Sequence, residues 1–334
     1  MPRSDSYTCG LEKKKTDRDM AHTEDSAARI RERILKGILA NRVPGFHYPG
    51  HFLDIRWPSI DGHRVVESME PGDHCLNPDG TVNLAALGVM VDTALATAPR
   101  LAIAPGERQA TVFMNLQLTG AVLRGPLSMT ADLETFSAVD TVRHAVTRGV
   151  LTCSGQTVGY ATATFVVLPP PKGVTMSPLP WQRDAASSDP ALYPPSPGED
   201  AILRACKRAL AKVDDQHSFI QYFWGIMPKA GTDNAVCRVK IGPHLGNRVG
   251  HMQGGLMLGL GAINASAAVP RHPMLSNVSA WYISPGHGGT VVAKSKVVHA
   301  GRSFAVVKTD LKSADGTLIC TLMTNHAAQV HPHK

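Results

Sequence analysis

Two apolar, almost uncharged segments of similar length constrain the fold of this chain most strongly. Residues 80–98 (GTVNLAALGVMVDTALATA) carry a single carboxylate, Asp92, and residues 250–264 (GHMQGGLMLGLGAIN) carry none. Both read as helices that are apolar on all sides, and such helices must be covered on more than one side. The most apolar window, 84–98, is interrupted by Asp92 and is too short to span a bilayer. The chain therefore has to enclose two central helices.

Runs with the alternation typical of β-strands follow each of these helices, four after the first and four after the second. The motif N-x-x-G-x-x-N/Q occurs at 77–83 and again 170 positions later, at 247–253. Gly125 and Gly289, each shortly before a strand, are 164 positions apart, and the difference falls in the loop 99–109. The sequence therefore contains an internal repeat in which a helix precedes a four-stranded antiparallel meander.

A Pro- and Ser-rich stretch without periodicity separates the two copies and indicates a linker. We expect a flexible tail at 1–26, a first domain with a leading helix at 27–168, the linker at 169–199 and a second domain at 200–330. A long helix held in a curled antiparallel sheet is the arrangement of the hotdog fold. The predicted fold class is α+β: a double hotdog of two antiparallel sheets, each wrapped around a long central helix and packed as an intramolecular pseudo-dimer.

Composition narrows the classes of partner. The 334-residue chain has a formal charge of +7, but its basic residues are dispersed and only 5% of residues are aromatic, which does not favour nucleic-acid binding. A polyphosphorylated small ligand fits this charge equally well. The six cysteines are scattered without a C-x-x-C pair, which predicts buried or free thiols rather than disulfides. The first residues contain no apolar signal region, so we expect a cytoplasmic protein without a membrane partner.

Chemical signals are divided between the two copies. The second copy has Asn247, then Gln253-Gly254-Gly255 at the helix start, and an alanine where the first copy has Asp92. Taken together the copies resemble the phenylacetate-type (PaaI-like) acyl-CoA thioesterases of the hotdog superfamily, with their Asn-x-x-Gly-x-x-His-Gly-Gly pattern and an acidic residue nine positions after the His. The resemblance implies hydrolysis of a small-molecule acyl thioester of coenzyme A or acyl carrier protein. It implies no cofactor, coenzyme A being part of the substrate.

The same resemblance assigns roles to residues outside the helices. In that family the first strand after the helix carries Ser or Thr four residues before an Asn, which helps to hold the attacking water. Thr111 and Asn115 fit this pattern, whereas the second half has Leu275 and Ser279 at the equivalent positions. The turn HAGRS (299–303) resembles a place where related proteins contact the coenzyme A arm, which makes Arg302 a candidate phosphate ligand.

One helix cannot supply the whole site, because its N-terminus and a residue eight positions on are separated by about 12 Å. Two hotdogs related by a twofold axis would place their central helices antiparallel, so that the middle of one approaches the N-terminus of the other. One working site is expected from catalytic residues of both halves: Asp92, Thr111, Asn247 and Gly254. Substrate-binding roles are expected for Gln253, Gly255 and Arg302. A second, inactive site would contain Asn77, Leu84 and Ala262.

Helix N-termini suit an oxyanion because their N–H groups are unpaired and carry partial positive charge. Gly254 N–H is the expected oxyanion donor, with the Asn247 amide as a second contact. Asp92 would act as general base toward water or attack the thioester itself. The structural alternatives are that Gly254 and Gly255 allow tight packing and that Asp92 is a structural carboxylate.

Two other functions stay open at this point. GDHCLNP (72–78) superficially resembles the motif of hotdog enoyl-CoA hydratases, although its spacing differs and no His follows. A non-catalytic acyl-CoA-binding hotdog is the other alternative. His244 and His251 are seven positions apart without a third ligand nearby, so no metal site is expected. A homo-oligomer, as a dimer of double hotdogs, is compatible with the sequence.

Overall fold

The computed structural model describes residues 17–104, 106–139, 142–169, 177–182, 195–286 and 289–328. Up to residue 168 the elements are α1 (Asp17–Asn41), α2 (Tyr48–Phe52), β1 (Arg56–Asp61), β2 (Arg64–Met69), α3 (Leu84–Arg100), β3 (Arg108–Leu118), β4 (Leu127–Val139), β5 (Val142–Cys153) and β6 (Gln156–Leu168). They are followed by η1 (Pro180–Gln182), α4 (Pro197–Leu210), α5 (Phe219–Trp224), β7 (Lys229–Ala230), β8 (Asn234–Lys240), η3 (Pro243–Leu245), α6 (Gly254–Ala268), β9 (Met274–Tyr282), β10 (Thr290–Ala300), β11 (Phe304–Ser313) and β12 (Leu318–Ala327).

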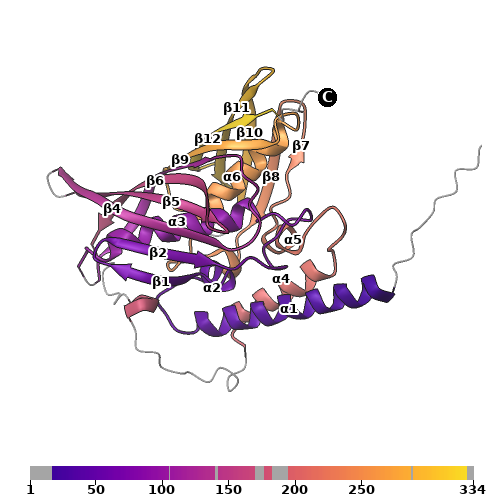
Figure 1. Cartoon of the computed structure of the whole chain (residues 1–334), viewed down its shortest axis with the longest axis horizontal. Coiled ribbons are helices and arrows are strands. Elements are labelled where there is room, and N and C mark those ends of the chain that lie inside the picture. Colours follow the sequence, from indigo (N-terminus) through magenta and orange to yellow (C-terminus); the bar gives the residue numbers. More distant parts are fainter. Residues whose placement is uncertain are drawn as a thin grey trace, which may run out of the picture.

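All neighbouring strands pair antiparallel, in the order β1-β2-β4-β5-β6-β3-β9-β12-β11-β10-β8-β7. Each half uses the same internal order, so the repeat extends to topology. The first strand after each helix does not open a simple meander, as the sequence predicted, but returns to pair with the last strand of its half. The prediction of two sheets was also wrong, because β3 and β9 pair with each other and join the halves into one sheet (Figure 1). This pairing satisfies backbone groups that two free edges would expose.

The β3–β9 pairing places an approximate twofold axis at one residue pair. Asn115 pairs with Ser279, its own equivalent 164 positions later, and Gln117 pairs with Asn277. Asn115 Nδ2 donates to Ser279 Oγ at 2.8 Å and to the Val278 carbonyl at 3.4 Å. Asn115, which marked the position of Thr111 in the sequence pattern, therefore stabilises the junction between the halves.

The central helices α3 and α6 pack directly against each other at the middle of the molecule (Figure 1). A Cβ at Gly88 would lie 2.3 Å from the Gly255 carbonyl oxygen, and one at Gly259 would lie 2.3 Å from Ala85 Cα. The earlier residue on α3, Ala85, lies against the later residue on α6, Gly259, and the later residue, Gly88, lies against the earlier one, Gly255. The two helices therefore run antiparallel. Only glycine permits such close backbone contact. The head of α6 therefore contains glycine partly for helix–helix packing.

Helices α1 and α4 lie together across one end of the molecule (Figure 1). Helix α1 begins at Asp17, within the segment predicted as a tail. Helix α4 begins at Pro197, within the predicted linker, because Ser196 and Glu199 form a capping box there. Glu199 also accepts from Arg42 at 2.7 Å, which ties the start of α4 to the chain just after α1.

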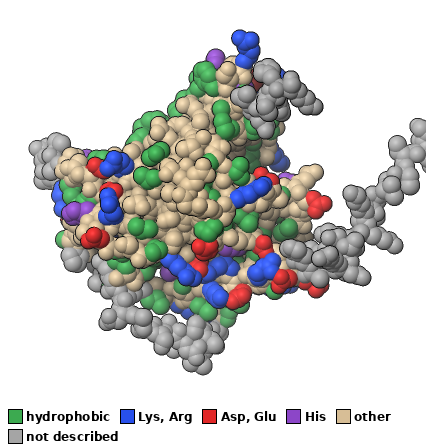
Figure 2. Space-filling view, viewed as in Figure 1, with side chains coloured by type: hydrophobic (Ala, Val, Ile, Leu, Met, Phe, Trp, Pro, Cys, Tyr) green, Lys and Arg blue, Asp and Glu red, His purple; other side chains and the backbone are tan. Residues whose placement is uncertain are grey.

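The surface and the thiols agree with the composition. On the face shown in Figure 2, Lys and Arg side chains are interspersed with acidic ones and gather toward the side that carries α1 and α4. The described cysteines are all free and buried, as predicted; they are Cys75, Cys153, Cys206, Cys237 and Cys320. Cys9 lies outside the described residues. No helix in the described ranges is long and apolar enough to cross a membrane.

Candidate active site at the helix interface

Asp92 lies in the middle of α3, facing the N-terminus of α6, and is only 8% exposed. Its Oδ2 accepts from Gln253 Nε2 at 2.7 Å and from Gly255 N–H at 3.2 Å. Its Oδ1 accepts from Thr111 Oγ1 at 3.1 Å, on β3. One carboxylate of the first half is thus held by the helix head of the second half, in the relative placement that the sequence predicted.

Gln253 both caps the start of α6 and donates a hydrogen bond to Asp92. It is the N-cap residue, and its Oε1 accepts from Leu256 N–H at 2.8 Å. This fixes the orientation of the amide, so that Nε2 points at Asp92. The side chain was expected to bind substrate, but its contacts instead position the carboxylate. The equivalent Asn83 is one methylene shorter; its oxygen caps Ala85 N–H and its nitrogen donates to Asn77 Oδ1, both at 2.9 Å.

The environment of Asp92 shifts its titration toward neutral pH. Burial raises the pKa of Asp92 to about 6, while hydrogen bonds from Thr111 and Gly255 lower it. The carboxylate is therefore mainly ionised at pH 7 but is a much stronger base than an exposed aspartate. A raised pKa of this size is typical of groups that transfer protons.

The two glycines have different tasks. Gly255, predicted to bind substrate, instead donates to Asp92 and packs on Gly88, and it does not line the cavity. Gly254 N–H has no hydrogen-bond partner among the described residues, because it stands in the first turn of α6. A Cβ at Gly254 would lie 2.9 Å from Asp92 Oδ2, so a side chain would crowd the carboxylate. Tyr282, on β9, donates to the Gly254 carbonyl at 3.0 Å and holds this turn in place.

A cavity of about 500 Å³ opens in front of this arrangement. Five of the predicted residues line it: Asp92, Thr111, Asn247, Gln253 and Gly254. Asn247 Oδ1 accepts from Val249 N–H and His251 N–H, both at 3.0 Å, so the amide NH2 is the group left for a ligand. The cavity thus combines a basic carboxylate, an unpaired helix N–H and a side-chain amide.

Arg302 is not part of this site. It lies exposed in the turn between β10 and β11, outside the residues that line the cavity. A surface role for this arginine was the alternative to a coenzyme A contact, and the geometry favours it.

Sequence reasoning missed the positive charge of the cavity. Arg100, Arg108 and Arg248 line it, and Asp92 is its only acidic lining residue within the described chain. Burial, together with the charge of Arg248, lowers the pKa of Arg100 to about 10. Arg100 and Arg108 belong to the first half and Arg248 to the second, so only the pairing of the two halves brings all three together.

A second buried carboxylate, Glu67, also escaped notice. It lies on β2, accepts from Thr93 Oγ1 and is fully buried. Burial above all, and also the charge of Asp92, raises the pKa of Glu67 well above its ordinary value. The signal was present in the sequence: Glu67 falls on the inward face of a strand between Val65 and Met69.

The equivalent place in the other half lacks a carboxylate. Ala262 occupies the position of Asp92 on α6 and is buried among apolar groups. Leu84 and Ala85 replace the glycine pair at the head of α3.

In the described chain, no three His, Cys, Asp or Glu side chains are grouped in a way that could hold a metal ion.

Part of the chain matches a known protein family, and its fold resembles solved structures. Residues 244–326 match the family model described as the acyl-CoA thioesterase N-terminal domain. No curated protein matches significantly. Solved structures that resemble the chain include a candidate oleoyl thioesterase from Lactobacillus plantarum, with 10% identity, a TM-score of 0.52 and coverage of 80% of this chain and 97% of that one.

Two further structures extend the comparison. A candidate thioesterase from Novosphingobium aromaticivorans DSM 12444 has 15% identity, a TM-score of 0.50 and coverage of 82% and 98% of the two chains. A conserved protein of unknown function with a hot dog fold from Alicyclobacillus acidocaldarius has 9% identity, a TM-score of 0.50 and coverage of 83% and 97%. These structures show that the chain has a hotdog fold. With the domain match, they confirm the predicted resemblance to hotdog-fold thioesterases.

Proposed function

We propose that this chain is an acyl-CoA thioesterase with one composite active site between two hotdog units, residues 27–168 and 200–330, which form an intramolecular pseudo-dimer. The observation that carries the proposal is the position of Asp92. This basic carboxylate of one unit lies against the N-terminus of the central helix of the other, on the wall of a cavity. The match of residues 244–326 to a thioesterase domain supports the same reaction.

The geometry assigns a role to each group. The thioester carbonyl oxygen would accept from Gly254 N–H and from the Asn247 amide, where the helix dipole stabilises the developing negative charge. Asp92 would take a proton from a water molecule that Thr111 helps to place, and the water oxygen would bond to the carbonyl carbon. Breakage of the carbon–sulfur bond then releases the thiol and the carboxylic acid. Direct attack by Asp92 would give the same products through a transient anhydride.

The arginines of the cavity suit the phosphate groups of coenzyme A. Guanidinium groups bind phosphate oxygens through paired, charge-assisted hydrogen bonds. With Arg100 on α3 two turns beyond Asp92, and Arg248 next to Asn247, an anionic group can be held at a distance from the reacting carbonyl. This role replaces the one expected for Arg302.

A hydrolysis panel tests the proposed function. Aliphatic, aromatic and hydroxylated acyl-CoAs, and one acyl carrier protein thioester, would be incubated with the protein while thiol release and enoyl-CoA absorbance are followed together. Thiol release without an enoyl signal is the expected result. Reversible hydration of enoyl-CoA without thiol release would establish a hydratase instead, and tight binding without turnover would establish a binding protein.

The pH dependence of turnover is expected to report on Asp92. Activity requires the ionised carboxylate, whose pKa is raised to about 6, so kcat/KM should fall with decreasing pH through about pH 6 rather than near pH 4. The profile is measured from pH 4.5 to 8 with a nonionisable acyl group. A flat profile down to pH 5 would contradict the role of Asp92.

The asymmetry of the two helix heads predicts unequal effects of equivalent substitutions. Asn247→Ala removes a proposed oxyanion donor and should lower turnover by about 10²-fold or more. Asn77→Ala alters the equivalent loop, which has no carboxylate opposite it, and should leave turnover close to that of the parent. Matched kcat measurements and thermal melts on both variants decide the point; equal losses of turnover would exclude a single composite site.

A further inference from the structure

A second cavity, of about 450 Å³, lies between α4, α5, η3 and the end of β8. It shares no lining residue with the cavity at Asp92. Four cationic side chains line it: Arg204, Arg208, Lys212 and Lys240. Its described lining contains no Asp or Glu. The cavity is therefore positively charged, and nothing in the proposed reaction uses it.

Within the described chain these four cations form no ion pair. None of the ion pairs among the described residues involves any of the four side chains. Arg204 and Arg208 are one turn apart on α4 and present their guanidinium groups on the same side of the helix. Like charges at this spacing repel, so an anion that enters the cavity relieves an unfavourable interaction.

In the first half of the molecule, the equivalent region contains carboxylates that the second half lacks. There, arginines of the leading helix α1 pair with two aspartates: Arg33 with Asp54 at 3.2 Å and Arg29 with Asp73 at 2.7 Å. Asp54 comes directly after the C-cap residue of the short helix α2 and has a left-handed backbone conformation, with φ 56°. Gly225 holds the equivalent position after α5 and has the same conformation, with φ 68°.

The second aspartate has also been replaced. Asp73 precedes His74, and 170 positions later Pro243 precedes His244. Both Gly225 and Pro243 line the second cavity. The repeat therefore keeps the backbone of this region but removes both carboxylates from the second copy, which leaves the site open to an external anion.

Two polar groups of the cavity wall also lack partners. Trp224 is 1% exposed, and no described group accepts from its indole Nε1–H. His244 Nδ1 is likewise buried without a partner, and burial, with the nearby charge of Arg208, lowers the pKa of this histidine to about 4. The Trp224 indole N–H is thus a buried donor without an acceptor; such groups are uncommon and are typically satisfied by a bound species.

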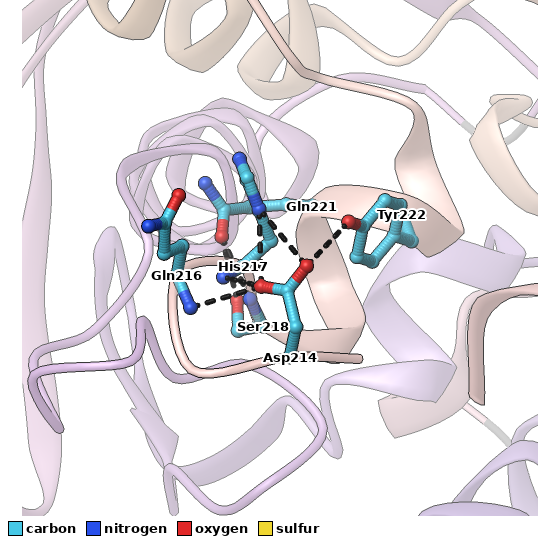
Figure 3. Close-up of polar contacts among 6 residues, drawn as sticks. All are labelled: Asp214, Gln216, His217, Ser218, Gln221 and Tyr222. Carbon is cyan, nitrogen blue, oxygen red and sulfur yellow. Dashed lines mark hydrogen bonds and ion pairs between the residues drawn. The ribbon is translucent and has the colours of Figure 1, made fainter. Parts of the chain in front are cut away.

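The loop between α4 and α5 holds the rim of the cavity in a fixed shape (Figure 3). Asp214 accepts from Gln216 N–H at 2.9 Å, from His217 N–H at 2.7 Å and from Tyr222 OH at 3.1 Å. Its carboxylate is thus engaged within the loop, while Tyr222 lines the cavity. A site that is already formed costs little ordering when a ligand binds.

We propose that this cavity binds a small phosphorylated anion, with phosphate oxygens held by Arg204, Arg208, Lys212 and Lys240. Phosphate groups suit this lining because guanidinium and ammonium groups bind them through charge-assisted hydrogen bonds, and the tyrosine and histidine rings offer an aromatic wall for an attached base. The proposal does not depend on thioester hydrolysis. The anion is either the nucleotide end of a coenzyme A ester, in which case Arg100 and Arg248 do not hold the coenzyme A phosphates, or a separate phosphorylated effector.

The test restores the missing carboxylate. Gly225→Asp recreates the position of Asp54, and nothing lies within 4 Å of a Cβ at Gly225. Gly225→Asn is the matched control, because asparagine has the same shape and tolerates the same backbone conformation without the charge. Calorimetric titration with inorganic pyrophosphate and with ADP is expected to show binding to the parent and to Gly225→Asn, and affinity about tenfold or more lower in Gly225→Asp.

A second pair of variants checks the cations directly. Arg204→Gln/Arg208→Gln should weaken pyrophosphate binding to the same extent, whereas Lys207→Gln, which removes one charge outside the cavity, should not. Absence of pyrophosphate binding to the parent at about millimolar concentration, or equal affinities for all variants, would overturn the proposal. Titration of coenzyme A then separates the sources: weaker binding to Gly225→Asp assigns the site to the substrate nucleotide, and unchanged binding assigns it to a separate effector.

Discussion

Asp92→Asn is expected to lower turnover by about 10²–10⁴-fold, the range typical of general acid–base catalysis, while acyl-CoA binding persists. The amide keeps the shape of the carboxylate. Its oxygen can still accept from Gln253 and Gly255, and its NH2 can donate to Thr111, which reverses one hydrogen bond. What is lost is the basic lone pair. Single-turnover kinetics with a purified variant measure this loss independently of product release.

The stability of the same variant distinguishes a catalytic from a purely structural carboxylate. Because burial raises the pKa of Asp92 from 3.8 to about 6, the folded protein retains a proton that the unfolded chain releases between these values. The contribution of Asp92 to the free energy of unfolding is therefore fully present below about pH 4 and is lost as the pH rises through about 6. At pH 7, keeping the carboxylate ionised in the folded protein costs of order 3 kcal/mol. Asparagine avoids this cost.

We therefore expect Asp92→Asn to melt at the same temperature as the parent or higher at pH 7.5, and the difference to shrink near pH 4. Asp132→Asn, at an exposed ion pair with Arg64, is a suitable control and should alter neither property appreciably. A melting temperature several degrees below that of the parent at pH 7.5, with activity that declines only in step with the folded fraction, would show a structural role.

Gly255→Ala is expected to have the largest effect on stability. Its Cβ would lie 2.0 Å from the Gly88 carbonyl oxygen and 2.6 Å from Val89 Cα, both on the backbone of α3. Helices α3 and α6 must then separate, because backbone atoms cannot rotate away as a side chain can. Overpacking of this kind costs about 1–3 kcal/mol or more, which lowers the melting temperature by several degrees.

The separation would also draw Gly255 N–H away from Asp92, so turnover should fall beyond the loss of folded protein. Gly198→Ala provides the control, since it adds the same methyl group to a helix, α4, where the nearest atom is 3.8 Å away. An unchanged melting temperature for Gly255→Ala would mean that the helix interface is looser than the geometry indicates.

The sequence was sufficient to predict that Asp92 and the head of α6 meet. The reason is that the repeat fixes equivalent positions, and a twofold axis between equivalent helices forces the middle of one toward the end of the other. The eight strands after the two helices could likewise be predicted, because each alternates apolar and polar residues. The short hairpin β1–β2 was missed although Asp61-Gly62-His63 is a recognisable turn between two alternating runs.

Other parts of the site depend on docking that no local pattern encodes. In the sequence, nothing marks Gly88 as important, and its role becomes clear only from its contact with Gly255. Likewise, Gln253 stands where the family pattern has a histidine, and its role becomes clear only from its hydrogen bonds to Leu256 N–H and Asp92. Arg100 and Arg248 belong to different halves of the chain and become neighbours only across the junction. Side-chain roles that arise from contact between the two halves could not be predicted from either half alone.

The β3–β9 pairing has a consequence for the chain as a folding unit. Each half in isolation would expose a long unpaired strand and a glycine-bearing helix face, both of which favour aggregation. Proteolytic nicking between residues 169 and 199 would leave these contacts in place, so the fragments should remain associated. Fragments expressed separately would instead have to meet before either is stable, and activity would return only when both are present, because Asp92 belongs to one fragment and Gly254 to the other.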